Sequence, residues 1–332
     1  MSFAPRAAID VIAVDKATLQ LAAQALQEGK LVAFPTETVY GLGALHTHKG
    51  AVERIFAAKG RPANHPLVLH VDSTEMARSL VGAWPAEAQA LADAFWPGPL
   101  TLVLPRAAHV SHLVTGGLDT VAVRVPDSPI ALALIRAAGD AIAAPSANPY
   151  QGLSPTTAEH VRRGLGSKVD MILDGGPCTR GLESTIVDVL SQTLLRLGPI
   201  SPKQLHHALP ELDVAPSLRV ADSESVHLAP GMDAKHYAPT ARLRVMATSA
   251  LENNMHHTDN AQVMVLAYSI DVGEGLGLRL SDRAEDYGAL LYAALHALDL
   301  TGISEIWVEQ VPSSPAWDTV RDRLARAAHH TT

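Results

Sequence analysis

A cluster of hydroxyl and carboxylate side chains stands where a hydrophobic run ends, in FPTETVYGLGA, residues 34 to 44. The preceding LVAFP is typical of a buried strand, and Thr36, Glu37 and Thr38 follow it directly. Open α/β sheets bind ligands beyond the carboxyl ends of their strands, so these side chains are candidate ligand contacts. They also fit a plain β-turn, in which threonines cap backbone groups and glycines permit positive φ.

A basic turn follows in IFAAKGRPANHPLVLHV, where Lys59, Arg61 and His65 fall within seven residues. Cations at a helix C-terminus are favoured by the macrodipole alone, which is one explanation for Lys59. Two prolines also stiffen this loop, and a rigid loop that holds an ammonium and a guanidinium can bind polyphosphate. The residues by themselves leave these two interpretations about even.

A third polar cluster lies in PSANPYQGLSPTTAEH. Ser146 and Asn148 follow a buried run and have no evident structural duty, which favours a ligand role. Ser154 with Pro155 predicts a helix start with serine at the N-cap and proline at N1, while Thr156 with a glutamate three residues later has capping-box spacing. Ser154 is therefore expected to be structural first, although a helix N-terminus also favours phosphate.

Four more residues invite a chemical interpretation. Ser184 enters a strand in GLESTIVDV, and Arg196 leaves the next strand. Arg124 stands in the apolar run TVAVRVP, where a buried cation is costly unless an anion or an acidic partner meets it. Cys178 has no neighbour that would activate a thiolate, so we interpret it as a turn residue.

Several familiar sites are missing from the sequence. It contains no G-x-x-x-x-G-K-[ST], no G-x-G-x-x-G after a strand and no H-E-x-x-H. A single cysteine excludes an internal disulfide and cysteine-cluster metal sites. The 16 histidines include adjacent pairs on polar segments, which do not face one ligand on a helix, so no metal site is assigned to protein side chains.

The helices and strands that must position these clusters are predicted from the periodicity of apolar residues and from the glycines and prolines that end each element. Strands outnumber helices in the first part, and several are close enough to pair antiparallel, which predicts a mixed α/β sheet. Expected helices are 15–30, 51–60, 86–96 and 128–139. Expected strands are 31–34, 66–71, 99–105, 120–126, 141–148, 171–176, 184–189 and 194–198.

The pattern breaks between residues 210 and 239, where four prolines and scattered charges predict a linker. This stretch is long for a tether, which favours its lying against a domain. Strand and helix then alternate, which predicts a small parallel sheet of Rossmann-like type. The predicted domains are thus 1–209 and 240–332. Expected elements of the second are strands 241–247, 261–269 and 305–311 and helices 285–302 and 316–328.

Charge is divided unevenly along the 332 residues. Residues 1–205 hold 17 basic and 17 acidic side chains, whereas residues 206–332 hold 9 and 17, so the whole excess of −8 lies in the second part. An anionic ligand in the first part is therefore not disfavoured. No apolar run approaches the roughly 18 residues of a membrane helix, and no signal-peptide core is present, so no membrane association and a cytoplasmic location are expected.

The polar clusters PTETVYGLG, KGRPANHPL, PSANPYQGLSPT and GLESTIVDV, in this order, resemble the YrdC-like family. APGMDAKHYAP and the Rossmann-like tail resemble its longer, two-domain Sua-type threonylcarbamoyl-AMP synthases. The resemblance implies a twisted mixed sheet with helices around a basic cavity. It also implies an enzyme that makes threonylcarbamoyl-AMP and pyrophosphate from L-threonine, bicarbonate and ATP with Mg²⁺, for threonylcarbamoyladenosine in tRNA.

The resemblance also implies roles for residues of this chain. Lys59 and Arg61 would be catalytic, by holding the phosphates, and Tyr237 in the linker would act as a lid. The implied threonine site consists of Thr36, His65, Arg124 and Ser184. The implied ATP site consists of Lys59, Arg61, Thr120, Ser146, Asn148, Ser154 and Arg196. The run Arg196-Leu197-Gly198-Pro199 departs from the family's usual Arg-Pro-Gly, which makes Arg196 the weakest of these matches.

Two other functions remain open from the sequence. Arg162, Arg163 and Lys168 form a basic run that could meet an RNA backbone in a binding module, although a solvated helix face is the preferred explanation. A related enzyme that acts on serine or another amine is the second alternative. Partners such as tRNA or a tRNA-modification transferase are expectations from the resemblance alone.

Overall fold

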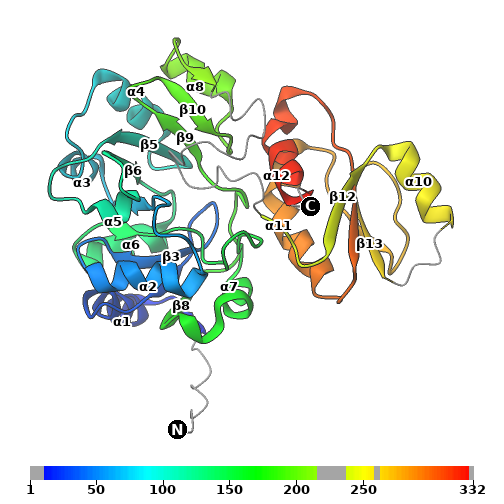
Figure 1. Ribbon diagram of the computed structural model, residues 1–332, viewed down its shortest axis with the longest axis horizontal. Helices are drawn as coiled ribbons and strands as arrows, with labels where there is room; N and C mark the ends of the chain where they lie inside the picture. Colours follow the sequence, from blue (N-terminus) through cyan, green and yellow to red (C-terminus); the bar gives the residue numbers. More distant parts are fainter. Residues whose placement is uncertain (1–10, 215–236, 258–261, 329–332) are drawn as a thin grey trace, which may run out of the picture.

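The computed structural model describes residues 11–214, 237–257 and 262–328, and their strands form two sheets. Figure 1 shows the larger sheet on one side of the molecule and the smaller, C-terminal sheet on the other. Most of the predicted linker, residues 215–236, lies outside the described residues. The division into domains at 209 and 240 stays a prediction, and residues 213–214 of that linker pair with the larger sheet.

The larger sheet mixes parallel and antiparallel pairs, as the close spacing of the strands predicted. Its eleven strands are ordered β1-β8-β2-β3-β7-β4-β6-β5-β9-β10-β11. Their bounds are β1 Val11–Ala13, β2 Val32–Phe34, β3 Gly41–Leu45, β4 Val68–His70, β5 Leu100–Pro105, β6 Thr120–Arg124, β7 Ile142–Ala143, β8 Met171–Asp174, β9 Thr185–Asp188, β10 Thr193–Arg196 and β11 Asp213–Val214.

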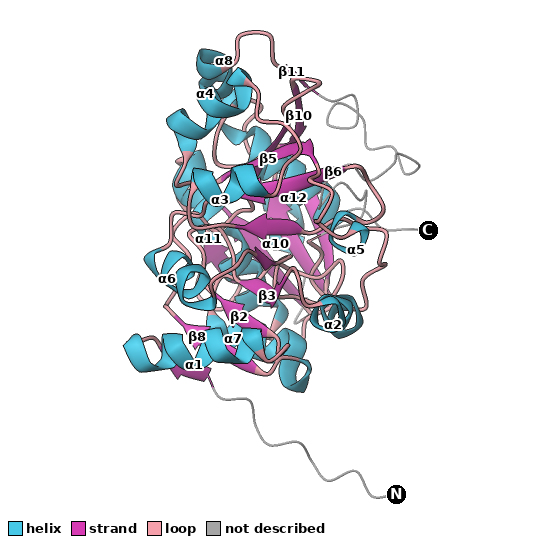
Figure 2. Cartoon of the chain, turned by 90° about the vertical axis from the view of Figure 1, so that its left-hand side faces the viewer, coloured by secondary structure: helices cyan, strands magenta, loops and turns pink. Residues whose placement is uncertain are grey.

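Helices cover both faces of this sheet, and Figure 2 shows α1 and α6 on one side with α2 and α5 on the other. Alanines and leucines of α1 and α6 pack on β2 and β8 in a core of fully buried side chains. The helices are α1 Lys16–Gln27, α2 Lys49–Lys59, α3 Thr74–Ser79, α4 Ala86–Phe95, α5 His112–Thr115, α6 Pro129–Ala138, α7 Ala158–Leu165 and α8 Pro202–Ala208, with a 3₁₀ turn, η1, at Gly166–Lys168.

The C-terminal sheet has four strands in the order β12-β15-β13-β14, and every pair is parallel. This confirms the predicted Rossmann-like alternation. In Figure 1 helices α11 and α12 lie on the side of this sheet that faces the larger one. The elements are β12 Arg242–Met246, α10 Thr248–His257, β13 Val263–Ala267, β14 Gly277–Arg279, α11 Ala284–Asp299, β15 Glu305–Glu309, the 3₁₀ turn η2 Pro315–Trp317 and α12 Asp318–Ala328.

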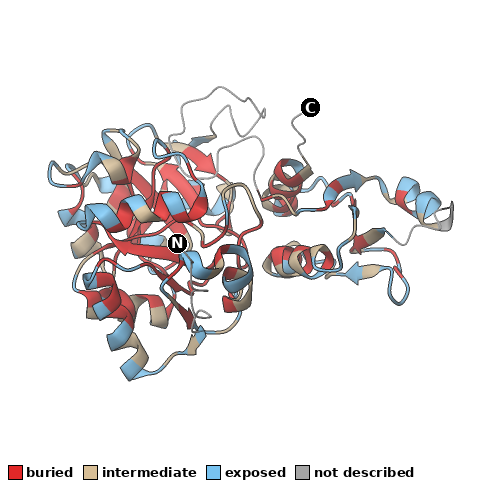
Figure 3. Cartoon of the chain, turned by 60° about the horizontal axis from the view of Figure 1, so that its bottom comes forward, coloured by how far each residue is buried: buried red, intermediate tan, exposed pale blue. Residues whose placement is uncertain are grey.

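Burial follows the same layers, and Figure 3 shows it concentrated in the strands of the larger sheet and on parts of α11 and α12. The apolar core of the C-terminal part includes Leu153 and Leu182, which belong to the first part of the chain. The two parts therefore share a packed apolar contact. Within the described residues, no helix combines the length and apolar character that crossing a bilayer would need.

Two local predictions were wrong. The helix expected to start at Ser154-Pro155 begins at Ala158, and its N-cap is Thr157, whose side chain accepts from the backbone of His160. Neither Ser154 nor Thr156 is the cap. The turn glycines Gly41 and Gly43 do not have positive φ, because they lie within strand β3.

Glycine is needed at position 43 for close packing instead. A Cβ there would lie 2.8 Å from both Ile142 Cγ2 and Phe34 Cε1, which is closer than side chains pack. Strand β3 pairs antiparallel with β2, with Phe34 opposite Gly41. The residues between the two strands form the loop of a β-hairpin.

Candidate active site between the hairpin loop and the C-terminal helices

The threonines of the β2–β3 loop turn back on their own backbone and on each other. Thr36 Oγ1 donates to the carbonyl of Val39 at 2.7 Å and lies 2.8 Å from Thr38 Oγ1. Both threonines and Glu37 are buried, at 1–6% exposure. The hydrogen bonds of the threonines are those of a turn. A turn on the protein surface would leave such side chains exposed to solvent, however, and these three are buried.

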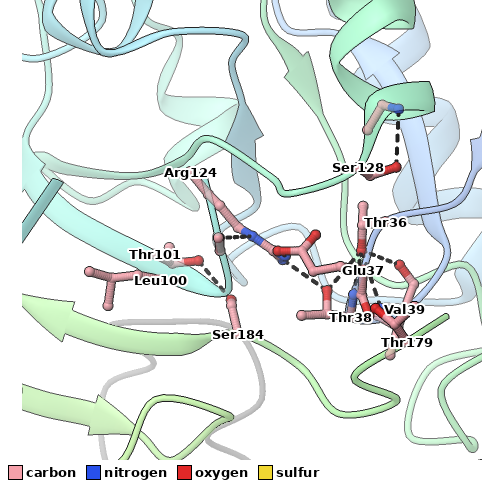
Figure 4. A network of polar contacts seen from close by, with 12 residues as sticks. Thr36, Glu37, Thr38, Val39, Leu100, Thr101, Arg124, Ser128, Thr179 and Ser184 are labelled. Atoms are coloured by element: carbon pink, nitrogen blue, oxygen red, sulfur yellow. Dashed lines mark hydrogen bonds and ion pairs between the residues drawn. The ribbon is translucent and has the colours of Figure 1, made fainter. Parts of the chain in front are cut away.

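Arg124, at the end of β6, has the acidic partner that its sequence context requires. Its Nη2 lies 2.6 Å from Glu37 Oε1, its Nη1 donates to Thr38 Oγ1 at 2.9 Å, and its Nε donates to the carbonyl of Gly98 at 3.2 Å. Figure 4 shows the Arg124 side chain beside Glu37 and Thr38 of the hairpin loop, although β7 and β4 separate β6 from β3 in the sheet. Arg124 is thus held by three groups at a fixed angle.

Ser184 and Arg196 meet where β9 begins and β10 ends. Arg196 donates through Nη2 to Ser184 Oγ at 3.1 Å and through Nε to the Ser184 carbonyl at 3.0 Å. Thr101 Oγ1 of β5 lies 2.7 Å from the same serine hydroxyl (Figure 4). Burial lowers the pKa of the Arg196 guanidinium, although nearby Tyr237 and Glu183 oppose the shift.

These groups line a cavity of about 60 Å³. Small-molecule sites usually measure about 300–1,000 Å³, so a nucleotide requires part of the wall to move. Three arginines and one glutamate on the wall leave it net positive, which suits an anionic ligand. The lining residues are Thr36, Thr38, Val39, Gly41, Arg61, Val68, His70, Arg124, Ala144, Pro145, Ser146, Glu183, Ser184, Arg196 and Tyr237.

Seven of the twelve residues assigned from the sequence therefore share one cavity. They are Thr36, Arg61, Arg124, Ser146, Ser184, Arg196 and Tyr237. Arg61 reaches it because α2 ends at Gly60, whose left-handed φ of 67° turns the chain, and its Nη2 donates to the Pro66 carbonyl at 3.2 Å. Residues as far apart in the sequence as Thr36 and Tyr237 therefore line the same cavity.

Lys59 does not line the cavity but supports one of its walls. Its buried ammonium donates to the carbonyls of Ser146 and Asn148 at 2.6 and 2.5 Å and to Asn148 Oδ1 at 3.2 Å. Burial, and then the charge of Arg61, hold the pKa of Lys59 well below its usual range. In this state Lys59 holds the loop after β7, whose Ser146 hydroxyl donates to Asn148 Oδ1 at 2.5 Å.

The remaining assigned residues lie outside the cavity wall. The ring of His65 packs edge-on against Tyr150, with ring centroids 5.6 Å apart. Thr120 is the first residue of β6, whereas Arg124 is the last residue of the same strand. Ser154 is fully buried and donates to Glu183 Oε1 at 2.5 Å. Asn148 also lies outside the wall, and the substrate roles of all twelve assigned residues stay predictions.

Two charged or titratable residues of the cavity wall, His70 and Glu183, were missed by the sequence interpretation. His70 ends β4 directly opposite Arg124 of β6, and burial, then the charge of Arg124, lower its pKa to about 3, so its imidazole is neutral. His70 could have been found from the sequence, because it stands in the apolar run LVLHV just as Arg124 stands in an apolar strand. Glu183 was hidden because nothing in GLEST shows which groups a glutamate will meet after folding.

The end of the predicted linker contributes Tyr237 to the cavity, and charged and polar residues of the C-terminal part lie behind it. Tyr237 is 1% exposed and lines the cavity, and burial, then the charge of Glu183, raise its pKa. Glu183 accepts from Tyr292 of α11 at 3.2 Å and from Arg323 of α12 at 2.9 Å. The acidic tail therefore reaches the edge of the site.

The cysteine does not supply a competing nucleophile, and two arginines of the basic run have an acidic neighbour. Burial, then the charge of Glu37, raise the pKa of Cys178 to about 12, which disfavours a nucleophilic thiolate. Arg162 and Arg163 both form ion pairs with Glu159, at 2.6 and 2.5 Å. Across the described ranges, no group of three or more His, Cys, Asp or Glu side chains is arranged to hold a metal ion.

Comparison with known proteins gives consistent matches along the chain. The Sua5/YciO/YrdC family model, described as telomere recombination, matches residues 24–198, and the model of the threonylcarbamoyl-AMP synthase C-terminal domain matches residues 200–329. The threonylcarbamoyl-AMP synthase of Pyrococcus abyssi is 39% identical, over 95% of this chain and 95% of the relative. That of Bacillus subtilis is also 39% identical, over 96% and 95%.

Solved structures agree with these matches. The crystal structure of P. abyssi Sua5 complexed with L-threonine superposes with a TM-score of 0.90 at 39% identity, covering 96% of this chain and 97% of that one. E. coli YciO, at 23% identity and a TM-score of 0.52, shares the fold of the first part and covers 57% of this chain. This chain belongs to the Sua5/YciO/YrdC family, in the form that carries a threonylcarbamoyl-AMP synthase C-terminal domain.

Proposed function

We propose that this chain is a threonylcarbamoyl-AMP synthase, which converts L-threonine, bicarbonate and ATP into threonylcarbamoyl-AMP and pyrophosphate. One observation carries the proposal. The cavity combines Arg124, held against Thr38 and Glu37, with the hydroxyls of Thr36 and Ser184, in a chain that superposes on a threonine-bound relative. A fixed guanidinium beside hydroxyls is suited to an amino acid that has a carboxylate and a hydroxyl group of its own.

The threonine site in this proposal lies against the β2–β3 loop. Arg124 would bind the substrate carboxylate, and Thr36 and Ser184 would contact its polar groups. His70 extends the same wall with a neutral imidazole, which can both donate and accept. A buried site of this kind discriminates by leaving polar groups unpaired when a substrate lacks the matching atom.

ATP would occupy the arginine-rich side of the cavity. Arg61 and Arg196 lie on the wall and supply positive charge for the phosphates, and Ser146 supplies a hydroxyl. Lys59 would act by holding the loop of Ser146 and Asn148, and its own contact with a phosphate would require it to leave two carbonyls. Tyr237 would close the site over the bound nucleotide. These residues come from both parts of the chain.

The reaction is mainly one of positioning. The amine of threonine forms a bond to the carbon of CO₂ or bicarbonate and loses a proton, with loss of water from bicarbonate, to give a carbamate. A carbamate oxygen then bonds to the α-phosphorus of ATP as the bond to the bridging oxygen breaks and pyrophosphate leaves. Held geometry and the arginine charges would supply most of the acceleration.

Mg²⁺ is proposed to enter with ATP. Phosphate oxygens are its usual ligands in nucleotide sites, and the ion would neutralise charge on the leaving pyrophosphate. The described residues supply no three-residue cluster of metal-ligating side chains, so phosphate oxygens of ATP and water would provide most of the ligands of the ion. The product would serve threonylcarbamoyladenosine formation in tRNA, through a separate transferase.

The deciding experiment measures pyrophosphate release from ATP with Mg²⁺, with threonine and bicarbonate added singly and together. Release that requires both, with threonylcarbamoyl-AMP identified by mass spectrometry, is the expected result. Serine in place of threonine tests the alternative amine. No release under any combination would overturn the proposal, and salt-sensitive tRNA binding would then be measured. The RNA-binding alternative is the less favoured one, because Arg162 and Arg163 are already paired with Glu159.

A further inference from the structure

Arg323, in the middle of α12, is an arginine with almost no solvent exposure. The residue is 1% exposed, and its side chain lies among groups from three distant segments of the chain. Its Nε donates to Glu183 Oε2 at 2.9 Å, and its Nη2 donates to the carbonyl of Leu197 at 2.7 Å. Its Nη1 pairs with Asp322 on the same helix.

Each long-range contact of Arg323 lies beside a residue of the cavity wall. Glu183 is itself on the wall and precedes Ser184, while Leu197 follows Arg196. The third contact is with Tyr237, whose ring centroid lies 5.0 Å from the guanidinium carbon. One side chain of the C-terminal part therefore touches the segments that carry Ser184, Arg196 and Tyr237.

The chemistry of the guanidinium explains why an arginine is needed here. Its planar fork presents several N–H donors at fixed angles and stacks on an aromatic face, which an ammonium cannot do. Glu183, with a residue exposure of 5%, also accepts from Ser154 and Tyr292, so its carboxylate is fully engaged. A buried charge network satisfied in this way has essentially one arrangement.

We propose that Arg323 is a positioning residue for the synthase site, which fixes Ser184 and Arg196 through their neighbours and holds the ring of Tyr237 against the cavity. The inference rests on the proposed function, and it assigns to the acidic C-terminal part a direct share in substrate binding. Arg323 does not touch the substrates. It acts by keeping both substrate subsites in register, and a misplacement of about 1 Å is enough to cost about 100-fold in rate.

The test uses Arg323→Lys in the full-length protein, with Arg321→Lys as the matched control. Lysine keeps the positive charge beside Glu183 but loses the carbonyl contact and the stacking. Arg321 lies on the same helix, and its contacts, with Asp318, Pro312 and Ser314, are all local. Pyrophosphate release yields kcat and KM for threonine and ATP, calorimetry yields the threonine Kd without ATP, and thermal melting checks folding.

Arg323→Lys is expected to raise the KM of both substrates and the threonine Kd by about tenfold, whereas Arg321→Lys leaves all three near wild type. A loss of folded protein lowers the apparent kcat but leaves both KM values unchanged, so unchanged KM values would overturn the proposal. A second variant, Arg323→Gln with Glu183→Gln, removes both charges. Recovery of wild-type KM in that variant would show that Arg323 only neutralises Glu183. Absence of activity in the wild-type protein would refute the proposed function instead.

Discussion

Arg124 and Glu37 form an ion pair of 2.6 Å between Nη2 and Oε1, with only 4% and 5% of their side chains exposed. The pair joins the end of β6 to the β2–β3 loop, so it fixes the loop on the sheet that carries the cavity. It also explains how an arginine is tolerated in an apolar strand, because a buried cation requires a nearby anion. Its energetic importance can be measured directly.

Glu37→Gln is expected to reduce the free energy of unfolding by about 3 kcal/mol, because it leaves the buried charge of Arg124 without its partner. The matched change is Glu285→Gln, which removes an exposed ion pair with Arg180 and should cost less than about 1 kcal/mol. Urea unfolding followed by circular dichroism measures both. Equal losses in the two variants would show that the buried pair has no special role.

His70→Ala is expected to weaken threonine binding about tenfold, which corresponds to the loss of one hydrogen bond worth about 1.4 kcal/mol. His70 lies on the cavity wall, whereas His65 packs on Tyr150 outside it. His65→Ala is therefore the comparison, with an expected change of less than about twofold. Calorimetric titration with threonine measures the Kd of both variants. A larger increase in Kd for His65→Ala than for His70→Ala would support the threonine role inferred for His65 from the sequence.

Lys59→Ala is expected to lower kcat/KM for ATP at least tenfold, because the loop of Ser146 and Asn148 loses its anchor. Threonine binding should stay within about twofold, since Lys59 lies outside the cavity wall. Lys49→Ala serves as the control, because Lys49 begins the same helix and its side chain is 80% exposed. Normal turnover by Lys59→Ala would contradict the phosphate and loop assignments together.

A stacked histidine pair should make stability depend on pH. His160 of α7 and His296 of α11 lie with ring centroids 3.9 Å apart. Burial, then the charge of His296, lower the pKa of His160 to about 4, and burial lowers that of His296 as well. Nearby Arg163 adds to both shifts, whereas Glu159 opposes the first and Asp299 the second.

The unfolded chain therefore binds more protons than the folded one between about pH 4 and pH 6.5, and stability rises with pH across this window. Replacing both histidines by glutamine should reduce the slope of stability against pH in this window, to which buried His70 also contributes, as measured by urea unfolding at several pH values. His207→Gln, at an exposed position on α8, should leave the profile unchanged. A double variant with an unaltered slope would refute the prediction.

Most elements could be predicted from the sequence because their causes are local. The helix expected over 285–302 is found at Ala284–Asp299, and the parallel C-terminal sheet follows from alternating apolar periods. The polar clusters that follow strands were expected to lie close together, since strand ends meet at one edge of a sheet, and several of their residues do line one cavity. Thr36, Arg124, Ser146 and Arg196 reach the cavity from strand ends or the loops after them, whereas Arg61 follows a helix and Tyr237 comes from the predicted linker.

Tertiary structure decided which partner each polar side chain would find. Ser154 resembled a helix cap, yet its hydroxyl donates to Glu183, 29 residues away, and the helix begins four residues later behind Thr157. A serine hydroxyl can satisfy either role at similar free energy, so local pattern does not choose between them. Packing brings the glutamate within reach and settles the choice.

The same reason applies to the charges that complete the cavity. Arg323 and Glu183 are 140 residues apart in the chain and 2.9 Å apart in the structure, and nothing near either residue identifies the other. The sequence by itself determined the strands, the helices and the polar residues at their ends, because these depend on neighbours. Burial and long-range pairing, which set the cavity wall and its charges, depend on the whole fold, and only the structure could reveal them.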